Sequence, residues 1–239
     1  MQELVTKFTQ DFIEKERWKF ITNGLKVTLE VTLISLVIGS IIGMLVAIIR
    51  CAHDQSSKED LKSVKGVLLS VLNFITKLYV TIIRGTPALV QLLIMYFIIM
   101  LSCKSKVAVA AVTFSINSGA YVSEIFRGGI MAVNKGQMEA GRSLGLNYFQ
   151  TMIYIIIPQA FKSVLPSLVN ELITLLKETS ICGYIGLNEL TRGGDIIRGA
   201  TFDALLPLFV VALIYLIMVL GISAVFERVE RRVRVSDHR

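Results

Sequence analysis

Cysteine and histidine are scarce in this sequence, and their placement excludes two kinds of site. The three cysteines, Cys51, Cys103 and Cys182, are widely spaced and form no Cys-x-x-Cys pair, so they support neither a disulfide framework nor a metal site. The two histidines, His53 and His238, give no His-based or Cys-based catalytic set. A nucleotide-binding loop of the Gly-x-x-x-x-Gly-Lys-Ser/Thr kind is also missing. The chain is therefore not expected to be an enzyme by itself or to carry a metal or other cofactor.

The N-terminal residues 1–20 contain no uninterrupted apolar core and no small-residue cleavage site, which argues against a cleaved signal peptide. The chain also lacks a single basic patch, although its formal net charge is +7. Its lysines and arginines are scattered around the ends of hydrophobic runs, where they suit membrane orientation and contact with anionic lipid. Nucleic acid is not an expected partner.

Long apolar runs dominate what is present, because 54% of the residues are apolar and most of them are clustered. A run of about 20 such residues crosses the hydrocarbon core as a helix. The pattern predicts an all-α, polytopic membrane protein with about five transmembrane helices. The expected parts are an amphipathic surface segment (1–23), a transmembrane domain (24–227) and a basic tail (228–239). The expected spans are 27–49, 88–103, 107–126, 151–176 and 205–226, with 67–83 as a tilted or interfacial helix.

The distribution of lysine and arginine favours an outside N-terminus and an inside C-terminus. Two prolines, Pro158 and Pro166, fall in the span 151–176, so this segment is expected to be bent or broken. A glycine-rich connection is expected to follow it, between 183 and 199.

Residues 134–150 form a polar stretch with a helical pattern of its own between two apolar spans. Asn134 is placed to cap a helix, and Gly145 lies where that helix would stop. Leu146 to Phe149 would then begin a second short segment. A helix, a glycine corner and a helix are therefore predicted to stand out of the bilayer.

At this stretch the sequence resembles the EAA loop of ABC importer permeases. The triplet reads Glu139-Ala140-Gly141, the spaced glycine is Gly145, and the ending is Ile156-Ile157-Pro158. Gly141 departs from the third alanine, which weakens the helix by up to about 1 kcal/mol. The resemblance implies a cytoplasmic coupling helix in which Glu139, Ala140, Gly141 and Gly145 dock into a groove on an ATPase subunit.

Three further stretches resemble the polar amino acid uptake branch of these permeases, the histidine, glutamine and arginine type. They are Arg84-Gly-Thr-Pro-Ala-Leu-Val-Gln-Leu92, Ser118-Gly-Ala-Tyr-Val-Ser-Glu124-Ile-Phe-Arg127 and Ile185-Gly-Leu-Asn-Glu189-Leu-Thr191. The resemblance implies a type I importer fold in a bacterial plasma membrane. It also implies four kinds of partner: cytoplasmic ATPase subunits, a second permease subunit (the same chain or a relative), an external amino-acid-binding protein and a polar amino acid substrate.

Polar side chains within the expected spans are candidates for a substrate path. Asn117, Tyr121 and Glu124 recur at i, i+4 and i+7 and so share one helix face. On the fourth span Asn170, Thr174 and Lys177 share a face, with Glu171 adjacent. Ionisable groups are costly in hydrocarbon and are expected to face inward. They either line a pocket, where Glu171 would accept an ammonium or guanidinium, or form hydrogen bonds that fix the bundle.

The sequence thus predicts the permease subunit of an ATP-driven importer for polar amino acids, with a basic amino acid as the hypothesis that Glu171 suggests. A proton-coupled secondary transporter that uses Glu124 and Glu171 remains an alternative, although it gives no reason for the projecting loop. A membrane anchor that only recruits a cytoplasmic partner is a further alternative. It predicts that the polar faces within the membrane tolerate replacement by leucine or alanine.

Overall fold

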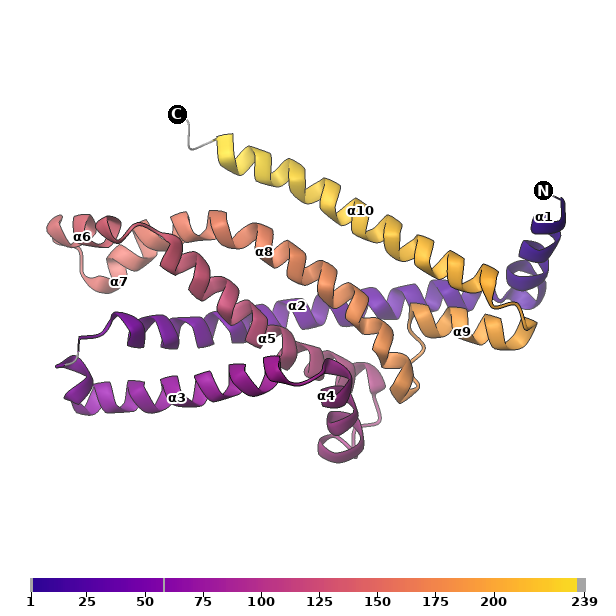
Figure 1. The fold of residues 1–239 in the computed structure, drawn as a ribbon, viewed down its shortest axis with the longest axis horizontal. Coiled ribbons are helices and arrows are strands. Elements are labelled where there is room, and N and C mark those ends of the chain that lie inside the picture. Colours follow the sequence, from indigo (N-terminus) through magenta and orange to yellow (C-terminus); the bar gives the residue numbers. More distant parts are fainter. Residues whose placement is uncertain (1, 58, 236–239) are drawn as a thin grey trace. The chain divides into compact units, whose positions relative to one another are not determined.

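The computed structural model describes residues 2–57 and 59–235, and in these ranges it contains helices and short connections but no strand (Figure 1). Short π or 3-10 turns are labelled η. The elements, in chain order, are α1 Gln2–Phe8, η1 Thr9–Ile13, η2 Glu14–Glu16, α2 Trp18–Gln55, η3 Asp60–Lys62, α3 Val64–Gly85, α4 Ala88–Ile94, η4 Met95–Ile99, α5 Lys106–Ala132, α6 Lys135–Ser143, α7 Tyr148–Thr151, η5 Met152–Ile156, α8 Ile157–Glu178, η6 Thr179–Ile185, α9 Leu190–Thr201 and α10 Leu205–Val235.

Four stretches of the described chain are helical, long and apolar enough to cross a membrane: Trp18–Gln55, Val64–Gly85, Met152–Ile185 and Leu205–Glu230. The helix α5 also has the length of a span, with 27 residues. Its composition is more polar, and its buried polar residues include Ser115, Asn117 and Ser118. The predicted all-α, polytopic fold is confirmed.

Two of the predicted helices around Pro87 are wrong in length. Residues 67–83 were expected to form less than a span, but α3 has 22 residues and reaches from Val64 to Gly85. Residues 88–103 were expected to cross, but the apolar helix there is the shorter Ala88–Ile99. The break between the two lies where Pro87 places it, because Thr86 has an extended backbone at φ −123° and ψ 146°.

The fourth predicted span carries its two prolines differently. Pro158 follows a π-helical turn, Met152–Ile156, which changes the hydrogen-bond pattern just before the missing donor. Pro166 lies inside α8, and the helix continues past it to Glu178. The segment is therefore modified at its start and unbroken at Pro166.

Both chain ends differ from the expected boundaries. The first long helix begins at Trp18, which lies within the predicted surface segment 1–23. At the other end α10 continues to Val235. Residue 1 and residues 236–239 of the predicted tail lie outside the described part of the chain.

The chain divides into two compact units. Among the described residues, unit 1 comprises 2–36, 87–114 and 172–224, and unit 2 comprises 37–57, 59–86, 115–171 and 225–235. Unit 1 contains two large apolar clusters. The first has Phe114, Leu92 and Leu175 at its centre. The second joins Phe12 of η1 to Leu190 and Ile197 of α9 and to Val211 of α10.

The second half of the predicted glycine-rich connection is the helix α9 of unit 1. Glu189 caps this helix, and its carboxylate accepts hydrogen bonds from the amides of Thr191 and Arg192, each at 2.7 Å. A Cβ at Gly193 would lie 2.6 Å from the Phe20 carbonyl oxygen, and a Cβ at Gly194 would lie 2.5 Å from Val211 Cγ2. Glycine at these two positions allows α9 to approach its neighbours, so this part of the expected glycine-rich connection is instead a packed helix.

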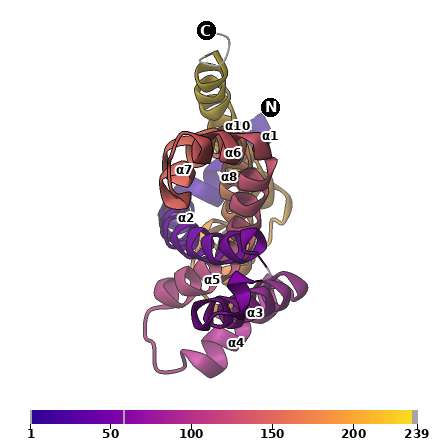
Figure 2. The same cartoon turned by 90° about the vertical axis from the view of Figure 1, so that its left-hand side faces the viewer.

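Unit 2 has a smaller apolar centre. Val46 of α2, Val80 of α3 and Ala120 of α5 are its buried members. The second half of α2 lies antiparallel to α3 (Figure 1). The Tyr79 hydroxyl donates a 2.6 Å hydrogen bond to the Ile116 carbonyl and so joins α3 to α5. Figure 2 looks onto the end of this unit that carries α6 and α7.

Candidate functional site: a coupling segment and a polar helix face

The helix α6 begins and ends as its sequence predicts. The Asn134 side chain accepts a 2.8 Å hydrogen bond from the Gly136 amide at the first turn. At the other end the Leu146 amide donates to the Gly141 carbonyl, and the Gly145 amide donates to that of Arg142. This is a Schellman motif, which requires a left-handed residue, and Gly145 has φ +82°. The predicted helix and glycine corner are confirmed.

A reciprocal capping pair starts the helix after the corner, and the sequence analysis missed it. The Gln150 amide donates to the Asn147 side chain, and the Asn147 amide donates to the Gln150 side chain, both at 2.9 Å. The signal was present in the sequence, because an N-cap residue followed three positions later by glutamine is typical of a capping box. The pair fixes the direction in which α7 leaves the corner.

Gly141, the departure from the EAA pattern, has a steric reason. It is buried, and a Cβ at this position would lie 2.5 Å from Thr151 Cγ2 and 3.0 Å from Ile155 Cδ1. Thr151 is itself buried and hydrogen-bonded to the Asn147 carbonyl, so it has little freedom to move away. The absent methyl group therefore lets α6 pack directly against the helix that follows the corner.

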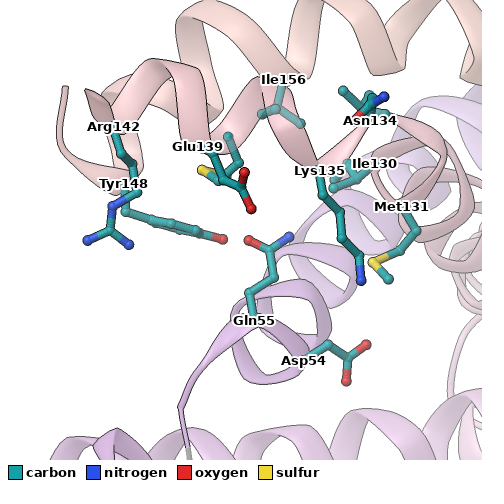
Figure 3. A pocket seen from close by; sticks show the side chains of 12 residues that line it. Asp54, Gln55, Ile130, Met131, Asn134, Lys135, Glu139, Arg142, Tyr148 and Ile156 are labelled. Carbon is teal, nitrogen blue, oxygen red and sulfur yellow. The ribbon is translucent and has the colours of Figure 1, made fainter. Parts of the chain in front are cut away.

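A cavity of about 360 Å³ lies between α6, α7 and the ends of α2 and α5. Figure 3 shows that Glu139, Gln55 and Tyr148 direct their polar ends into this space. Burial raises the pKa of the Tyr148 hydroxyl above its ordinary value. The full lining is Asp54, Gln55, Ile130, Met131, Val133, Asn134, Lys135, Met138, Glu139, Arg142, Tyr148 and Ile156.

The opposite side of the corner is open to solvent. Ala140 and Gly145 are exposed, and Leu144 between them leaves 79% of its surface uncovered. Leu144 therefore presents an uncovered apolar side chain beside the glycine corner. The sequence analysis did not single out Leu144, because its exposure depends on how the corner turns.

The polar face of α5 meets three different helices within unit 2. The Arg84 guanidinium of α3 lies 5.2 Å from the centre of the Tyr121 ring. The Ser118 hydroxyl donates a 2.7 Å hydrogen bond to the Glu171 carboxylate of α8. Glu124 is paired with Arg50 of α2. Asn117 is buried on the same helix.

The residues predicted on α8 fall on two sides of that helix. Glu171 is only 8% exposed and contacts Ser118. Asn170, Thr174 and Lys177 are exposed. Thr174 and Lys177 belong to unit 1, whereas the other candidate path residues belong to unit 2. Sequence reasoning missed Ser118 and Arg84 as partners, although both lie within the stretches that carry the resemblance.

The fold combines the capped helix and glycine corner of residues 134–150 with a polar face on α5. Residues 66–235 match the family described as the binding-protein-dependent transport system inner membrane component, and the chain belongs to that family. It is an integral membrane protein of the ABC permease class.

Several relatives match along most of their length. A putative glutamine transport system permease protein GlnP of Rickettsia felis is 39% identical over 91% of this chain and 94% of its own. The arginine transport system permease protein ArtQ of Bacillus subtilis is 36% identical over the same shares. The glutamine transport system permease protein GlnP of Escherichia coli K12 is 35% identical over 89% of this chain and 92% of its own.

Solved structures agree with the fold. A crystal structure of an amino acid ABC transporter with histidines shares 37% identity and a TM-score of 0.78, and the match covers 92% of this chain and 98% of that one. The MetNI methionine ABC transporter in an inward-facing form, at 20% identity, has a TM-score of 0.76 over 90% and 97% of the two chains. At that identity the second likeness concerns the fold alone.

Proposed function

We propose that this chain forms the translocation path of an ATP-driven importer for polar amino acids and couples that path to separate ATPase subunits. The observation that carries the proposal is the coupling segment: a capped helix closed by a Schellman corner, with Leu144 exposed beside Gly145. A connection between two spans does not need these features, whereas a docking element does. The relatives named for glutamine and arginine transport support an amino acid as the cargo.

In this proposal the coupling residues act in two ways. Ala140, Leu144 and Gly145 form the exposed contact with the ATPase. Gly141 allows α6 to pack directly against Thr151, so that a displacement of α6 is transmitted to α7 and α8. Glu139 belongs to the same docking element and lies in the middle of α6.

The proposed substrate path comprises Asn117, Tyr121, Glu124, Asn170, Glu171 and Thr174. Glu171 is its central residue, because it is a buried carboxylate whose described hydrogen bond comes from a neutral hydroxyl. A carboxylate in that setting binds an ammonium or guanidinium through a charge-assisted hydrogen bond. Arginine, lysine and glutamine all carry an α-ammonium, but only arginine and lysine also have a cationic side chain. A cationic amino acid therefore fits the site better than glutamine.

The chain works with partners in this proposal: two cytoplasmic ATPase subunits, a second permease subunit and an external binding protein. The N-terminus lies outside and the C-terminus inside, which puts the coupling segment on the ATPase side. A single small bundle seldom encloses a whole path, so a second copy or a close relative completes it.

Uptake of labelled arginine, lysine and glutamine into vesicles that hold the purified chain tests the proposal. The vesicles are prepared with and without the partner ATPase subunits and trapped ATP, and the external binding protein is added to the outside solution. Uptake is expected only in the complete system, with arginine or lysine exceeding glutamine. Uptake driven by a proton gradient without the ATPase would overturn the proposal and favour a secondary transporter.

A further inference from the structure

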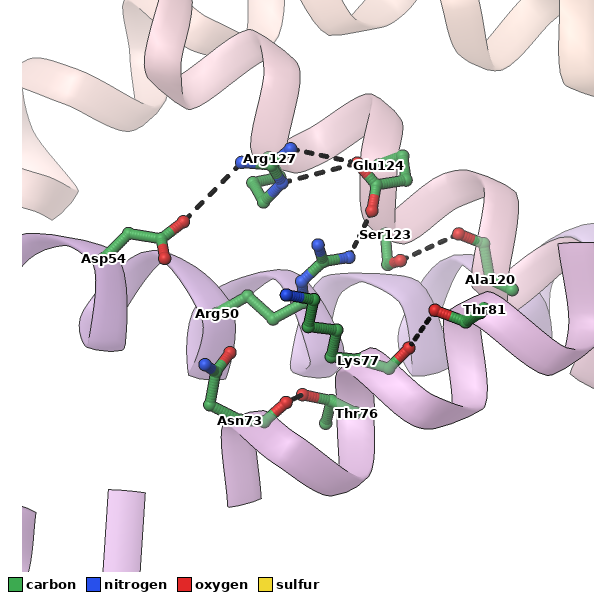
Figure 4. Close-up of polar contacts among 10 residues, drawn as sticks. All are labelled: Arg50, Asp54, Asn73, Thr76, Lys77, Thr81, Ala120, Ser123, Glu124 and Arg127. Atoms are coloured by element: carbon green, nitrogen blue, oxygen red, sulfur yellow. Dashed lines mark hydrogen bonds and ion pairs between the residues drawn. The ribbon is translucent and has the colours of Figure 1, made fainter. Parts of the chain in front are cut away.

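Four charged side chains join α2 to α5 at the end of unit 2 that carries α6 (Figure 4). Arg50 of α2 is hydrogen-bonded to Glu124 of α5. The other carboxylate oxygen of Glu124 accepts from Nε and Nη2 of Arg127, both at 3.3 Å. Arg127 Nη1 in turn lies 3.6 Å from an oxygen of Asp54, which returns the chain of contacts to α2. Two cations and two anions therefore balance one another across two helices.

The inner pair of this network is well shielded from solvent. The Arg50 side chain is 13% exposed and that of Glu124 is 22% exposed. Removing one member of a shielded pair leaves the other charge without compensation, which destabilises the arrangement far more than the loss of an exposed pair. The arrangement is therefore sensitive to the loss of a single member of the network.

The same two helices approach each other closely further along. A Cβ at Gly43 of α2 would lie 2.7 Å from Val122 Cβ, and a Cβ at Gly119 of α5 would lie 2.8 Å from Ile42 Cγ2. The helices are thus joined at two levels, by small-residue packing at Gly43 and Gly119 and by charges at Arg50 and Glu124. Two separate attachments prevent one helix from tilting against the other.

The network also borders the cavity beside the coupling helix. Asp54, its outer member, lines that cavity together with Lys135 and Glu139 of α6. Arg127 lies in the last turns of α5, and only a short connection separates α5 from α6. A displacement of α6 is therefore applied directly to the helix end that carries Glu124 and Arg127.

We propose that Arg50, Asp54, Glu124 and Arg127 form a clamp that makes α2 and α5 move as one body when α6 is displaced. The proposal rests on the coupling function proposed above and adds positioning residues to it. With the clamp closed, motion of the coupling segment reaches both helices. With the clamp open, α5 follows α6 alone, and the ATPase turns over without a matching change in the path.

The test compares uptake per ATP hydrolysed in the complete importer for the original chain and three variants. Arg50→Gln removes the inner cation and is expected to lower the ratio by about tenfold, within the usual range of coupling effects, while ATP hydrolysis continues. Arg50→Lys keeps the charge and is expected to restore most of the ratio. Asp195→Asn breaks an arginine–carboxylate set on α9 in unit 1 and is expected to leave the ratio unchanged.

Cys51 provides a second readout that does not depend on transport. Cys51 is buried, with 2% of its surface exposed, and it follows Arg50 in the chain. In a Cys103→Ser background, maleimide labelling of Cys51 is expected to be slow in the original chain and faster with Glu124→Gln. Cys182, which is buried in unit 1, serves as the internal control and is expected to stay protected in both.

The outcomes separate the two proposals. If the original importer takes up no amino acid with ATP, the proposed function fails, and the clamp falls with it. If the original importer transports and Arg50→Gln keeps its ratio of uptake to hydrolysis, the clamp alone is wrong. Equal losses of uptake and hydrolysis while Cys182 stays protected would show that the network does not act on coupling and would also contradict the clamp.

Discussion

Each unit of this protein contains a buried glutamate, and the two carboxylates have different hydrogen-bond partners. Glu189 of unit 1 is 1% exposed, and its carboxylate is occupied by two backbone amides at the start of α9. Glu171 of unit 2 is 8% exposed and meets the Ser118 hydroxyl. A carboxylate that caps a helix has a structural task already, whereas one held by a single neutral hydroxyl has capacity to bind a cation.

The two units also differ in the contacts that hold their helices together. Unit 1 is packed around two large apolar clusters. Unit 2 has a small apolar cluster and instead joins its helices by ion pairs, a cation–π contact and hydrogen bonds. The helices of unit 1 are thus held mainly by apolar packing, whereas those of unit 2, which carries most of the proposed path residues, are joined largely by polar contacts.

The largest expected effect on stability comes from truncating the core of unit 1. Phe114 is fully buried in the first apolar cluster, so Phe114→Ala is expected to cost about 3–5 kcal/mol of unfolding free energy. Val80→Ala in the small cluster of unit 2 removes fewer atoms and should cost less. Thermal unfolding in detergent measures both. A loss at Val80 as large as that at Phe114 would contradict the contrast between the units.

The next effect concerns the fit of the coupling helix. Gly141→Ala places a methyl group against Thr151 and is expected to cost about 1–3 kcal/mol, as overpacking usually does. Thr151→Ser removes the methyl group that is in the way and should recover much of the loss. Hydrogen exchange of the α6 amides provides the measurement.

Gly128→Ala is the matched control, because a Cβ there meets nothing within 4 Å. This substitution is expected to raise the free energy of unfolding by up to about 1 kcal/mol, because alanine favours the helix more than glycine does. If Gly141→Ala stabilises the protein as Gly128→Ala does, the close contact with Thr151 is not what requires glycine.

A smaller effect is expected at the helix caps. Asn134→Ala removes the acceptor for the Gly136 amide and should cost about 1 kcal/mol, which frays the start of α6 and lowers uptake. Ser63→Ala removes the equivalent cap of α3, where the side chain accepts from the Gly66 amide, at a similar cost. Uptake by the folded protein should change only at Asn134. An equal decrease in uptake for Asn134→Ala and Ser63→Ala would contradict a specific role of α6 in coupling.

The smallest effect is a pH dependence on the surface of α9. Hydrogen bonds and charge from Arg198, then from Arg192, lower the pKa of Asp195 below its ordinary value of 3.8. The stability that this carboxylate contributes is therefore present above that value and is lost as the pH falls through the lowered pKa. Thermal melts at acid pH should show a slightly shallower decline for Asp195→Asn than for the original chain.

Local sequence signals predicted the coupling segment well, because its caps and glycine corner depend on neighbours within a few residues. Asn134 and Gly145 act as their types suggest. The break before Pro87 was predictable for the same reason. Hydropathy underestimated the length of α3, since Asn73 and Lys77 interrupt an apolar run without ending the helix. It overestimated the helix after Pro87, because that helix ends at Ile99 while the apolar run continues.

The partners of polar residues were not predictable from spacing alone. Asn117, Tyr121 and Glu124 share a face of α5, as expected, but the residues that meet this helix come from separate parts of the chain. Arg84 lies over Tyr121, and Arg50 pairs with Glu124. Periodicity identifies a face, whereas tertiary packing decides what covers it. The packed helix α9 was missed for a related reason, since its glycines are explained only by neighbours distant in sequence.

The most direct test of this division of labour compares Glu171→Gln with Glu189→Gln in the same uptake and stability assays. Glutamine at position 171 still accepts from Ser118, so the fold should hold while binding of arginine weakens by about tenfold or more through loss of the charge. Glutamine at position 189 offers an amide group to one of the two backbone donors, so stability should fall while uptake by the folded protein persists. Normal arginine binding by Glu171→Gln, together with lost transport by a stable Glu189→Gln protein, would reverse the roles assigned to the two glutamates.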